Sequence, residues 1–335
     1  MAIAPPFDPA ASGGEETLDA TLRPRTFDRF VGQRRVVENL LLAIRAAKAR
    51  GEPLDHILLS GLPGLGKTTL AAIVAHAMEA QIHASSGPAI VRPADLVGIL
   101  SNLQANDILF IDEIHRLPRP VEEVLYTAME DYVVDVVLDQ GPAARSLRIT
   151  IPHFTLIGAT TREGNLSAPF RARFGLQEKM DLYPGCELAE IVERSAAALG
   201  VSLRAPSARF IADRSRGTPR IANRFLRRVR DLAQDRYGNV IDEQVAAEGL
   251  KLLGVDDQGL CALDRRILAT LERHGGGPVG LKTIAVAVGE EERTIEDVYE
   301  PFLIRMGLLS RTPQGRCLPP SYRENPEKRP QGLFF

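Results

Sequence analysis

The run Gly61–Thr68, Gly-Leu-Pro-Gly-Leu-Gly-Lys-Thr, constrains the fold of this chain more than any other feature. It fits the pattern G-x-x-x-x-G-K-[ST], in which glycines let successive backbone N–H groups face a polyphosphate. The apolar run His56–Ser60 before it predicts a buried strand, and Thr69–Ala75 after it predicts the start of a helix. The positive end of that helix dipole would favour the same phosphates. This order of strand, loop and helix predicts a nucleotide-binding α/β domain.

Two acidic residues follow a second apolar run. Ile108–Ile111 predicts a buried strand, and Asp112 and Glu113 come directly after it. Ligands of open parallel sheets bind outside the carboxyl ends of the strands, so these carboxylates should lie beside the phosphate loop. Lys67 would bring its charge to the β- and γ-phosphates of ATP, and the Thr68 hydroxyl would ligate Mg²⁺. Asp112 would hold the metal through its water shell, and Glu113 would polarise the attacking water. The two runs together predict an ATPase core.

Polar residues also follow a third predicted strand, Phe154–Gly158. If this strand lies between the other two, Thr161 or Thr160 could hydrogen-bond the γ-phosphate or the attacking water. Ordinary capping of the strand end is the alternative. Further on, the run Pro169–Phe174 contains the pair Arg171 and Arg173, which suits an arginine finger for a neighbouring subunit, although a solvated arginine is the more common case.

The composition argues against several other classes of protein. The 335 residues carry a net charge of -2, so any contact with nucleic acid must be local. The 3 cysteines lack CxxC spacing and the 6 histidines lack ligand spacing, which argues against a disulfide framework and a zinc site. The apolar runs are too short to span a membrane, and residues 1–20 are predicted to be a flexible tail and not a signal peptide. We therefore expect a cytoplasmic protein.

The patterning predicts three folded parts. Residues 21–182 alternate strand-like and helix-like runs, as an α/β domain with a parallel sheet does. Residues 183–255 show mainly helical periodicity. Residues 256–335 contain three helical runs and a hairpin around the turn Thr312–Gly315, which is typical of a winged helix.

Arg311 and Arg316 flank this turn and are candidates for contacts with DNA. Because the C-terminal part carries no net positive charge, a winged helix that binds protein is the alternative.

Two further segments each allow two interpretations. Tyr132–Leu138 and Arg145–Ile151 are β-prone runs around a Gly-Pro turn, which predicts a hairpin. It is either a core hairpin or an apolar arm for a partner, since its valines exceed what one buried face needs. Residues 204–236 contain ten arginines and no lysine. Arg220 begins a helix there and could fold back onto bound nucleotide, whereas the other arginines suit a solvated or intersubunit face.

Several motifs occur together with the phosphate loop. They are Phe110-Ile-Asp-Glu-Ile-His-Arg116, Glu122-Glu-Val-Leu-Tyr126, Met129-Glu-Asp-Tyr132, Gly158-Ala-Thr-Thr-Arg162, Gly217-Thr-Pro-Arg-Ile-Ala-Asn-Arg224, Gly276-Gly-Pro-Val-Gly-Leu281 and Thr294-Ile-Glu-Asp-Val298. From about Leu22 to about residue 320, the chain resembles the RuvB family of bacterial Holliday-junction branch-migration motors. The resemblance implies an α/β P-loop AAA+ core with a parallel sheet, a small helical lid domain and a C-terminal winged helix.

The resemblance also implies an activity and partners. It implies an ATP- and Mg²⁺-dependent motor that forms a homohexameric ring on duplex DNA and drives branch migration in recombination and repair. RuvA would load the ring onto the Holliday junction through the hairpin Val133–Ile149, and RuvC would join in a resolvasome. No membrane is involved.

The resemblance further implies roles for individual residues. Thr161 would be sensor 1, Arg220 sensor 2 and Arg173 the finger acting in trans, with Arg311 and Arg316 on DNA. The other implied nucleotide contacts are Leu22, Arg23, Gly64, Leu65, Gly66, Lys67, Thr68, Thr69, Glu130, Asp131, Tyr132 and Tyr183.

One position departs from the family pattern, and two other functions fit parts of the chain. Leu62 stands where the family is expected to have proline, which predicts intact ATP binding with a slightly less rigid loop. An AAA+ core with a winged helix also describes replication initiators, which bind and switch without processive turnover. A clamp-loader ATPase is a third possibility, but its helical collar would lack the wing. The apolar hairpin and the Met129–Tyr132 run favour the motor.

Overall fold

The computed structural model describes residues 22–137 and 146–324. These residues form two compact units, 23–181 and 182–324, and the second unit also includes Leu22. Each unit is described separately below.

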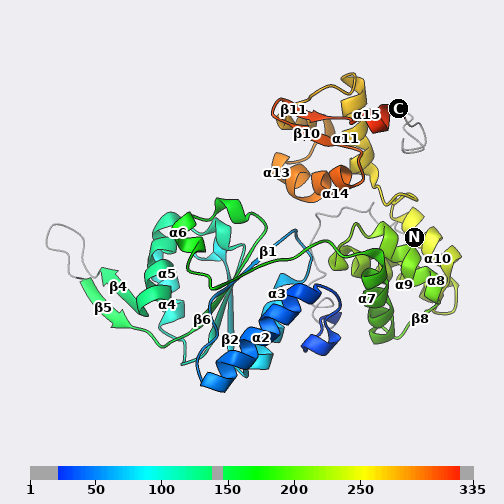
Figure 1. Ribbon diagram of the computed structural model, residues 1–335. Helices are drawn as coiled ribbons and strands as arrows, with labels where there is room; N and C mark the ends of the chain where they lie inside the picture. The colour runs from blue at the N-terminus through cyan, green and yellow to red at the C-terminus, as the bar shows by residue number, and fades with distance from the viewer. Residues whose placement is uncertain (1–21, 138–145, 325–335) are drawn as a thin grey trace. The chain divides into compact units, whose positions relative to one another are not determined.

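The first unit is built on a five-stranded parallel sheet (Figure 1). Its strands are β1 (Ile57–Ser60), β2 (Ile82–Ser86), β3 (Ile108–Asp112), β6 (Thr155–Thr160) and β7 (Leu176–Lys179). Their order across the sheet is β2-β3-β6-β1-β7. β6 therefore lies between the strand of the phosphate loop and the strand that ends in the acidic pair, which confirms the predicted arrangement.

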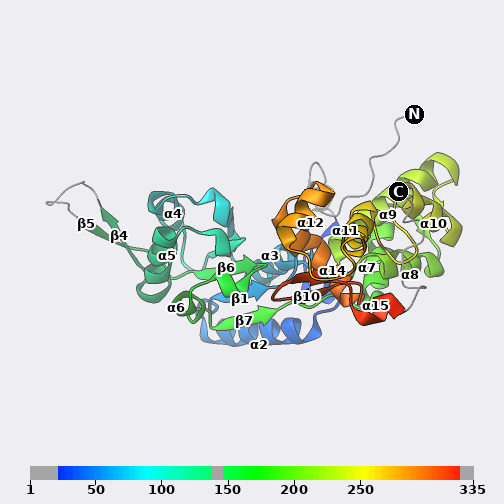
Figure 2. The same ribbon diagram turned by 90° about the horizontal axis from the view of Figure 1, so that it is seen from above.

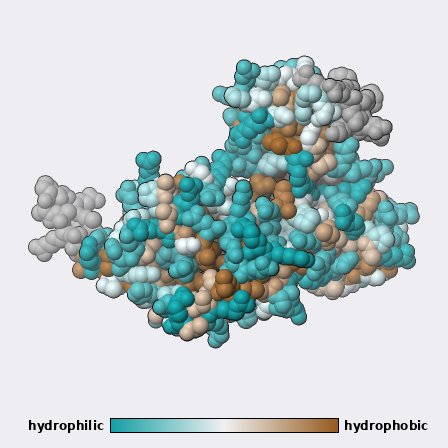
Figure 3. All heavy atoms as spheres, viewed as in Figure 1, coloured by the Kyte–Doolittle hydropathy of each residue, from teal (hydrophilic) through white to brown (hydrophobic). Residues whose placement is uncertain are grey.

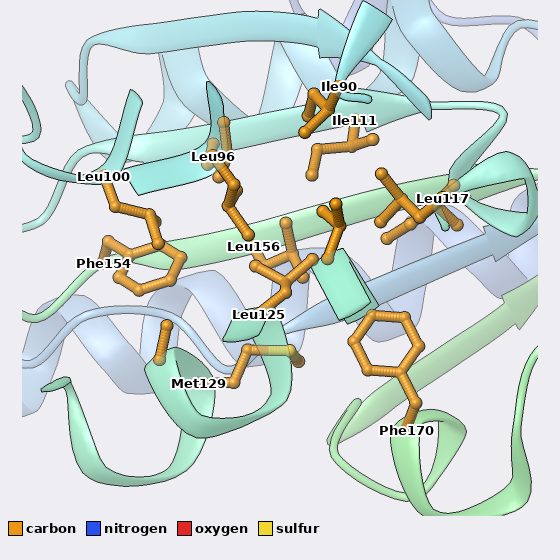
Figure 4. Packing of buried hydrophobic residues seen from close by; sticks show 14 of the residues in the cluster. Ile90, Leu96, Leu100, Ile111, Leu117, Leu125, Met129, Phe154, Leu156 and Phe170 are labelled. Carbon is orange, nitrogen blue, oxygen red and sulfur yellow. The ribbon is translucent and has the colours of Figure 1, made fainter. Parts of the chain in front are cut away.

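Helices cover both faces of this sheet (Figures 1 and 2). They are α2 (Arg34–Arg50), α3 (Lys67–Met78), α4 (Pro93–Leu100), α5 (Arg119–Asp131) and the short α6 (Ala168–Arg171). α4 and α5 pack on one face, where Leu96, Leu125 and Met129 meet Phe154 and Leu156 in a closed apolar core (Figure 4). Burial of these side chains stabilises the packing of α4 and α5 on the sheet that carries the acidic pair.

Two strands of the sheet were not predicted from the sequence. Every residue of β2 is exposed or half-buried, and β7 buries Glu178 but no apolar residue fully. Both lie at the ends of the strand order, where one side of the strand has no neighbour. Edge strands need no continuous apolar run, so hydrophobic patterning does not reveal them.

A hairpin extends from the end of α5. β4 (Val133–Val137) pairs antiparallel with β5 (Ser146–Thr150), as predicted, and the turn 138–145 lies outside the described residues. Val134 is buried against the core of the first unit. Leu147 in β5 is 49% exposed. The base of the hairpin therefore belongs to the core, while β5 presents an apolar side chain to solvent.

The second unit begins with a helical part. Its elements are α7 (Gly185–Ala198), β8 (Ser202–Leu203), α8 (Ala205–Arg214), α9 (Pro219–Arg236), β9 (Val240–Ile241) and α10 (Glu243–Leu252). β8 and β9 form a two-residue parallel pair. The arginine-rich α9 buries Phe225, Leu226 and Val229, so most of its arginines surround an apolar stripe. We refer to residues 183–255 as the lid domain.

The remaining described residues form a winged helix. Its elements are α11 (Ala262–Arg273), α12 (Leu281–Val288), α13 (Glu292–Thr294), a π-helical turn (Ile295–Tyr299), α14 (Glu300–Arg305), β10 (Ser310–Thr312), β11 (Gly315–Cys317) and α15 (Pro320–Glu324). The sequence predicted one helix over Thr294–Met306, where the structure has the π turn followed by α14. Gly315 has φ 141° and a Cβ there would lie 2.5 Å from the Val279 carbonyl oxygen, so only glycine fits the start of β11.

The face of the molecule seen in Figure 3 is largely hydrophilic. In the part of the chain that the structure describes, no helix is long and apolar enough to cross a membrane.

Candidate nucleotide-binding site

The phosphate loop connects β1 to α3, and its backbone conformation depends on glycine. Gly64 has φ 78° and Gly66, the N-cap of α3, has φ 103°. Glycine adopts such left-handed angles without strain, which suits the tight turn of an anion site at a helix N-terminus. Thr68 and Thr69 are half-buried in the first turn of α3. The five predicted phosphate contacts from Gly64 to Thr69 thus lie on one short segment with Lys67.

The Lys67 ammonium is already bound within the loop. It is 7% exposed, and Nζ donates to the carbonyl oxygens of Gly61 at 2.7 Å and Leu62 at 2.9 Å. Leu62 therefore contributes to this interaction through its backbone, which does not depend on having proline at this position. A buried ammonium needs acceptors of this kind.

Asp112 lies next to Thr68. The Thr68 hydroxyl is 3.4 Å from Asp112 Oδ2, and Asp112 Oδ1 accepts from the backbone N–H of Glu113 at 2.9 Å. A hydroxyl beside a carboxylate supplies the hard oxygen donors that Mg²⁺ prefers, and Mg²⁺ at phosphates keeps several waters. Within residues 22–137 and 146–324 there is no cluster of three or more His, Cys, Asp or Glu side chains suited to a metal. The donors present fit Mg²⁺ bound together with a polyphosphate.

Glu113 occupies a left-handed conformation with φ 48° and pairs with Arg116. The distance from Glu113 Oε2 to Arg116 Nη1 is 2.8 Å, and both side chains are partly exposed. This ion pair holds the Glu113 carboxylate toward Arg116. No role for Arg116 follows from the sequence alone.

The threonines at the end of β6 differ in their surroundings. Thr160 is 1% exposed, lies 3.0 Å from His115 Nδ1 and accepts a hydrogen bond from the N–H of Arg162 at 3.0 Å. It therefore holds the strand end. Thr161, the next residue, is half-buried and stays the candidate for contact with the γ-phosphate. His115 is a further polar residue here that the sequence did not single out.

Arg173 lies beside α5. Its Nη2 is bound to the Tyr126 hydroxyl and lies 2.7 Å from Glu130 Oε2, and its guanidinium carbon lies 4.6 Å from the centre of the Tyr126 ring. The hydrogen bond to Tyr126 raises the pKa of Arg173, so the guanidinium stays charged. Two predicted interface residues, Arg173 and Glu130, are thus neighbours, with Asp131 and Tyr132 directly after Glu130 at the end of α5.

The remaining predicted nucleotide contacts belong to two units. Arg23 is exposed and belongs to the first unit. Leu22, Tyr183 and Arg220 belong to the second unit, where Leu22 and Tyr183 are buried and Arg220 is exposed in the first turn of α9. The N–H of Tyr183 donates to the carbonyl oxygen of Gly217 at 2.9 Å. Tyr183 is therefore fixed to the turn that leads to Arg220.

The two arginines of the wing are in different environments. Arg311 has a 53% exposed side chain that is bound to Glu296, and it is accessible to a phosphate. Arg316 is 10% exposed, and its Nη2 lies 3.2 Å from Glu300 Oε2. Contact of Arg316 with DNA stays a prediction, and it requires this buried ion pair to open.

The phosphate loop and the acidic pair lie at the carboxyl end of one parallel sheet, and the strand that carries Thr160 lies between their two strands. These features define an ATPase of the AAA+ class. In this chain a helical lid and a winged helix follow that core. Three family models match it in succession: the Holliday junction DNA helicase RuvB P-loop domain over residues 22–180, the RuvB AAA lid domain over 183–256 and the RuvB C-terminal winged helix domain over 257–321. The chain belongs to the RuvB family.

Individual relatives agree with this assignment. The chain is 53% identical over 323 residues to the Holliday junction branch migration complex subunit RuvB of Myxococcus xanthus, covering 95% of this chain and 94% of that protein. Its fold is similar to that of the Thermotoga maritima RuvB Holliday junction branch migration motor, with a TM-score of 0.83 and 46% identity over 91% of this chain and 97% of the other. A variant of the same Thermotoga protein gives a TM-score of 0.84 over 90% and 97% of the two chains.

Proposed function

We propose that this protein is an ATP-driven motor that moves Holliday junctions along duplex DNA in recombination and repair. The observation that carries the proposal is the joint presence of a P-loop domain and a winged helix in one chain of the RuvB family. The phosphate loop supplies the energy-yielding reaction, and the winged helix supplies a surface for duplex DNA.

The residues of the site suggest the order of events. The phosphates of ATP would replace the carbonyl oxygens of Gly61 and Leu62 as partners of the Lys67 ammonium. Bound Mg²⁺ would neutralise charge that develops on the phosphate oxygens. Thr68 would ligate it, with Asp112 behind the bound water. Glu113, once released from Arg116, would accept the proton of the attacking water, and Thr161 would orient that water.

We infer that the finger residue acts on a neighbouring subunit in a homohexameric ring. Arg173 is 33% exposed and stays charged, so it is available to a γ-phosphate from outside its own subunit. Glu130, Asp131 and Tyr132 would lie at the same interface, and Arg23 would contact the nucleotide bound in its own subunit. Leu22, Tyr183 and Arg220 would report the state of that nucleotide to the lid.

We further propose three external partners. Duplex DNA and the Holliday junction would contact the wing around Arg311. RuvA would dock on the hairpin β4–β5, where Leu147 is exposed. RuvC would join the assembled junction complex, and the cytoplasm is the compartment in which these reactions take place.

Steady-state ATP hydrolysis tests the proposed function directly. Rates are measured at one salt concentration without DNA, with linear duplex and with a four-way junction, each with and without RuvA. Salt is fixed because binding through phosphates depends on it steeply. The largest rate with junction and RuvA together supports the motor. Tight DNA binding with slow hydrolysis that neither junction nor RuvA changes would instead indicate a nucleotide-gated initiator.

A mixing experiment tests catalysis in trans. Arg173→Ala should bind ATP and lose turnover by about 10³-fold or more. Lys67→Ala should not bind ATP productively but keeps its own finger. Mixed rings would contain interfaces with an intact site from one variant and an intact finger from the other, so part of the activity should return. Absence of any recovery in rings that demonstrably mix would argue against a finger in trans.

A further inference from the structure

The turn that precedes α9 is joined to the winged helix by a buried ion pair. Arg216, in this turn, is 3% exposed and has φ 57°. Its Nη1 donates to Asp264 Oδ1 at 3.3 Å, and its Nη2 is bound to the other oxygen of the same carboxylate. Asp264 is 0% exposed and lies in the first turn of α11. A two-point contact therefore connects the lid domain to the first helix of the winged helix.

Aromatic and cationic side chains complete this junction. The Arg216 guanidinium lies 4.5 Å from the centre of the Phe302 ring in α14, and Arg305 lies 5.7 Å from the same ring. Burial, together with repulsion from Arg216, lowers the pKa of Arg305. Buried charges are tolerated only when they are paired. Separation of Arg216 from Asp264 would therefore leave two buried charges without a partner of opposite sign, which is energetically costly.

The connecting segment is also fixed. Arg265 in α11 donates to Asp256 Oδ2 at 3.1 Å and to the carbonyl oxygen of Gly254 at 3.0 Å. Asp256 Oδ1 in turn accepts from the backbone N–H groups of Gln258 at 3.0 Å and Leu260 at 2.9 Å. The segment between the two domains is therefore held against α11 and is not a free hinge.

The same turn carries the predicted nucleotide sensor. Arg220 follows Arg216 by four positions, and the N–H of Thr218 donates to the carbonyl oxygen of Ser215 at 3.0 Å. Gly217 has φ 73°, and a Cβ on it would lie 2.4 Å from Arg305 Nη1, so α14 packs directly on the turn. Movement of the start of α9 would thus reach the winged helix through two contacts with α11 and α14.

We propose that Arg216 is a positioning residue that holds the lid and the winged helix together as one rigid body, so that movement of the sensor turn during the ATP cycle moves the DNA-binding domain. This inference rests on the proposed function, since it assigns a route by which hydrolysis becomes movement of DNA. A flexible connection would let the lid respond to nucleotide while the winged helix stayed on its DNA. A buried ion pair between the lid domain and the winged helix prevents this independent movement.

The efficiency of coupling tests the proposal. Asp264→Asn keeps the shape and an acceptor for the Cys261 N–H, which now donates to Asp264 Oδ2 at 2.7 Å, but it removes the charge that faces Arg216. Arg216→Lys keeps the charge and loses the two-point contact. The matched control is Asp257→Asn, because Asp257 lies 3.6 Å from Arg214 in the same region and its side chain is 100% exposed.

Base pairs of junction moved per ATP hydrolysed are measured with RuvA present, together with ATPase rates without DNA. We expect the DNA-free ATPase of all three variants to stay within about twofold of the parent, whereas movement per ATP falls by about tenfold in Asp264→Asn and less in Arg216→Lys. The control should match the parent. Unchanged movement per ATP in both junction variants would overturn the proposal. A parent that hydrolyses ATP but moves no junction would instead overturn the proposed function.

A second measurement needs no variant. Cys261 lies in the junction, is 1% exposed, and burial raises its pKa to about 11, so it should resist alkylation. Cys186 is exposed and serves as an internal control. Alkylation of each cysteine by N-ethylmaleimide is followed by mass spectrometry without nucleotide, with ADP and with a non-hydrolysable ATP analogue. Protection of Cys261 in all three states is expected; rapid labelling of Cys261 in any one of them would show that the junction opens and would overturn the rigid body.

Discussion

At the scale of single residues, the surroundings of Arg173 suggest how a finger keeps its direction. The guanidinium is held by the Tyr126 hydroxyl and by Glu130, and neither contact involves nucleotide. We expect Tyr126→Phe to lower the ATPase rate roughly fivefold with unchanged ATP affinity, because it removes one hydrogen bond and keeps the ring. Rates and nucleotide affinity are measured on assembled rings.

Tyr237→Phe is the control for this prediction. It removes another tyrosine hydroxyl, which donates to Glu248 in the lid domain, far from α5 in the sequence. Equal losses of activity in the two variants would mean that Tyr126 does not act through Arg173.

His56 gives a prediction for the dependence of stability on pH. It accepts from the N–H of Leu156 at 2.9 Å and lies 3.3 Å from the carbonyl oxygen of Met129, and burial lowers its pKa below the ordinary value of about 6.5. Burial therefore favours the neutral His56 ring in the folded state. The contribution of His56 to the free energy of unfolding is complete above pH 6.5 and is lost as the pH falls toward the lower folded-state pKa.

The free energy of unfolding, measured in urea at pH 5 and pH 7.5, should fall with acid less steeply in His56→Asn than in the parent. His274→Asn, at an exposed histidine in the winged helix, should retain the slope of the parent. A parent and a His56 variant with the same slope would contradict this account.

The sequence predicted some residues of the site better than others. Lys67, Thr68, Asp112 and Glu113 follow from their positions after strands, since strand ends of a parallel sheet converge. Arg116, His115 and Tyr126 could not be predicted in their roles, because their partners are fixed by side-chain directions after folding. The burial of Arg316 was not foreseen either, since Glu300 lies on a helix and reaches β11 only in the folded domain.

At the scale of elements, the hairpin β4–β5 offers a test of the proposed docking surface. Leu147→Asp should reduce stimulation of the ATPase by RuvA about tenfold, because an exposed apolar side chain at a docking site contributes by burial on binding. The DNA-free ATPase should not change. Leu252→Asp is the control, since Leu252 is 55% exposed on α10 against 49% for Leu147. Normal stimulation of the Leu147 variant by RuvA would show that RuvA does not dock on the hairpin.

Elements that an apolar run and a bordering glycine mark were predicted best. β1 and α3 lie where the sequence predicted a strand and the start of a helix, with Gly61 after the one and Gly66 before the other. β2 and β7 were not predicted, because the residues of these two edge strands form no apolar run. The helix before the wing was predicted as continuous, but a π turn interrupts it at Ile295–Tyr299, and no residue type there signals a change of hydrogen-bond register.

At the scale of the whole molecule, the two compact units imply a specific thermal behaviour. The proposed nucleotide contacts include Lys67 in one unit and Arg220 in the other, so a bound ATP analogue should stabilise both. Scanning calorimetry of the parent should show both unfolding transitions rising in temperature with Mg²⁺ and analogue. In Arg220→Ala the transition of the second unit should rise less than in the parent, because only Leu22 and Tyr183 of that unit remain as nucleotide contacts. An equal rise in the variant and the parent would remove Arg220 from the nucleotide site.

Lys67 carries a consequence for the phosphate loop itself. Its ammonium donates to the carbonyl oxygens of Gly61 and Leu62, which come directly after β1, while Lys67 itself begins α3. The cation that would attract a polyphosphate therefore also ties the two ends of the loop to each other. Loss of this charge would loosen the loop as well as weaken its attraction for phosphate.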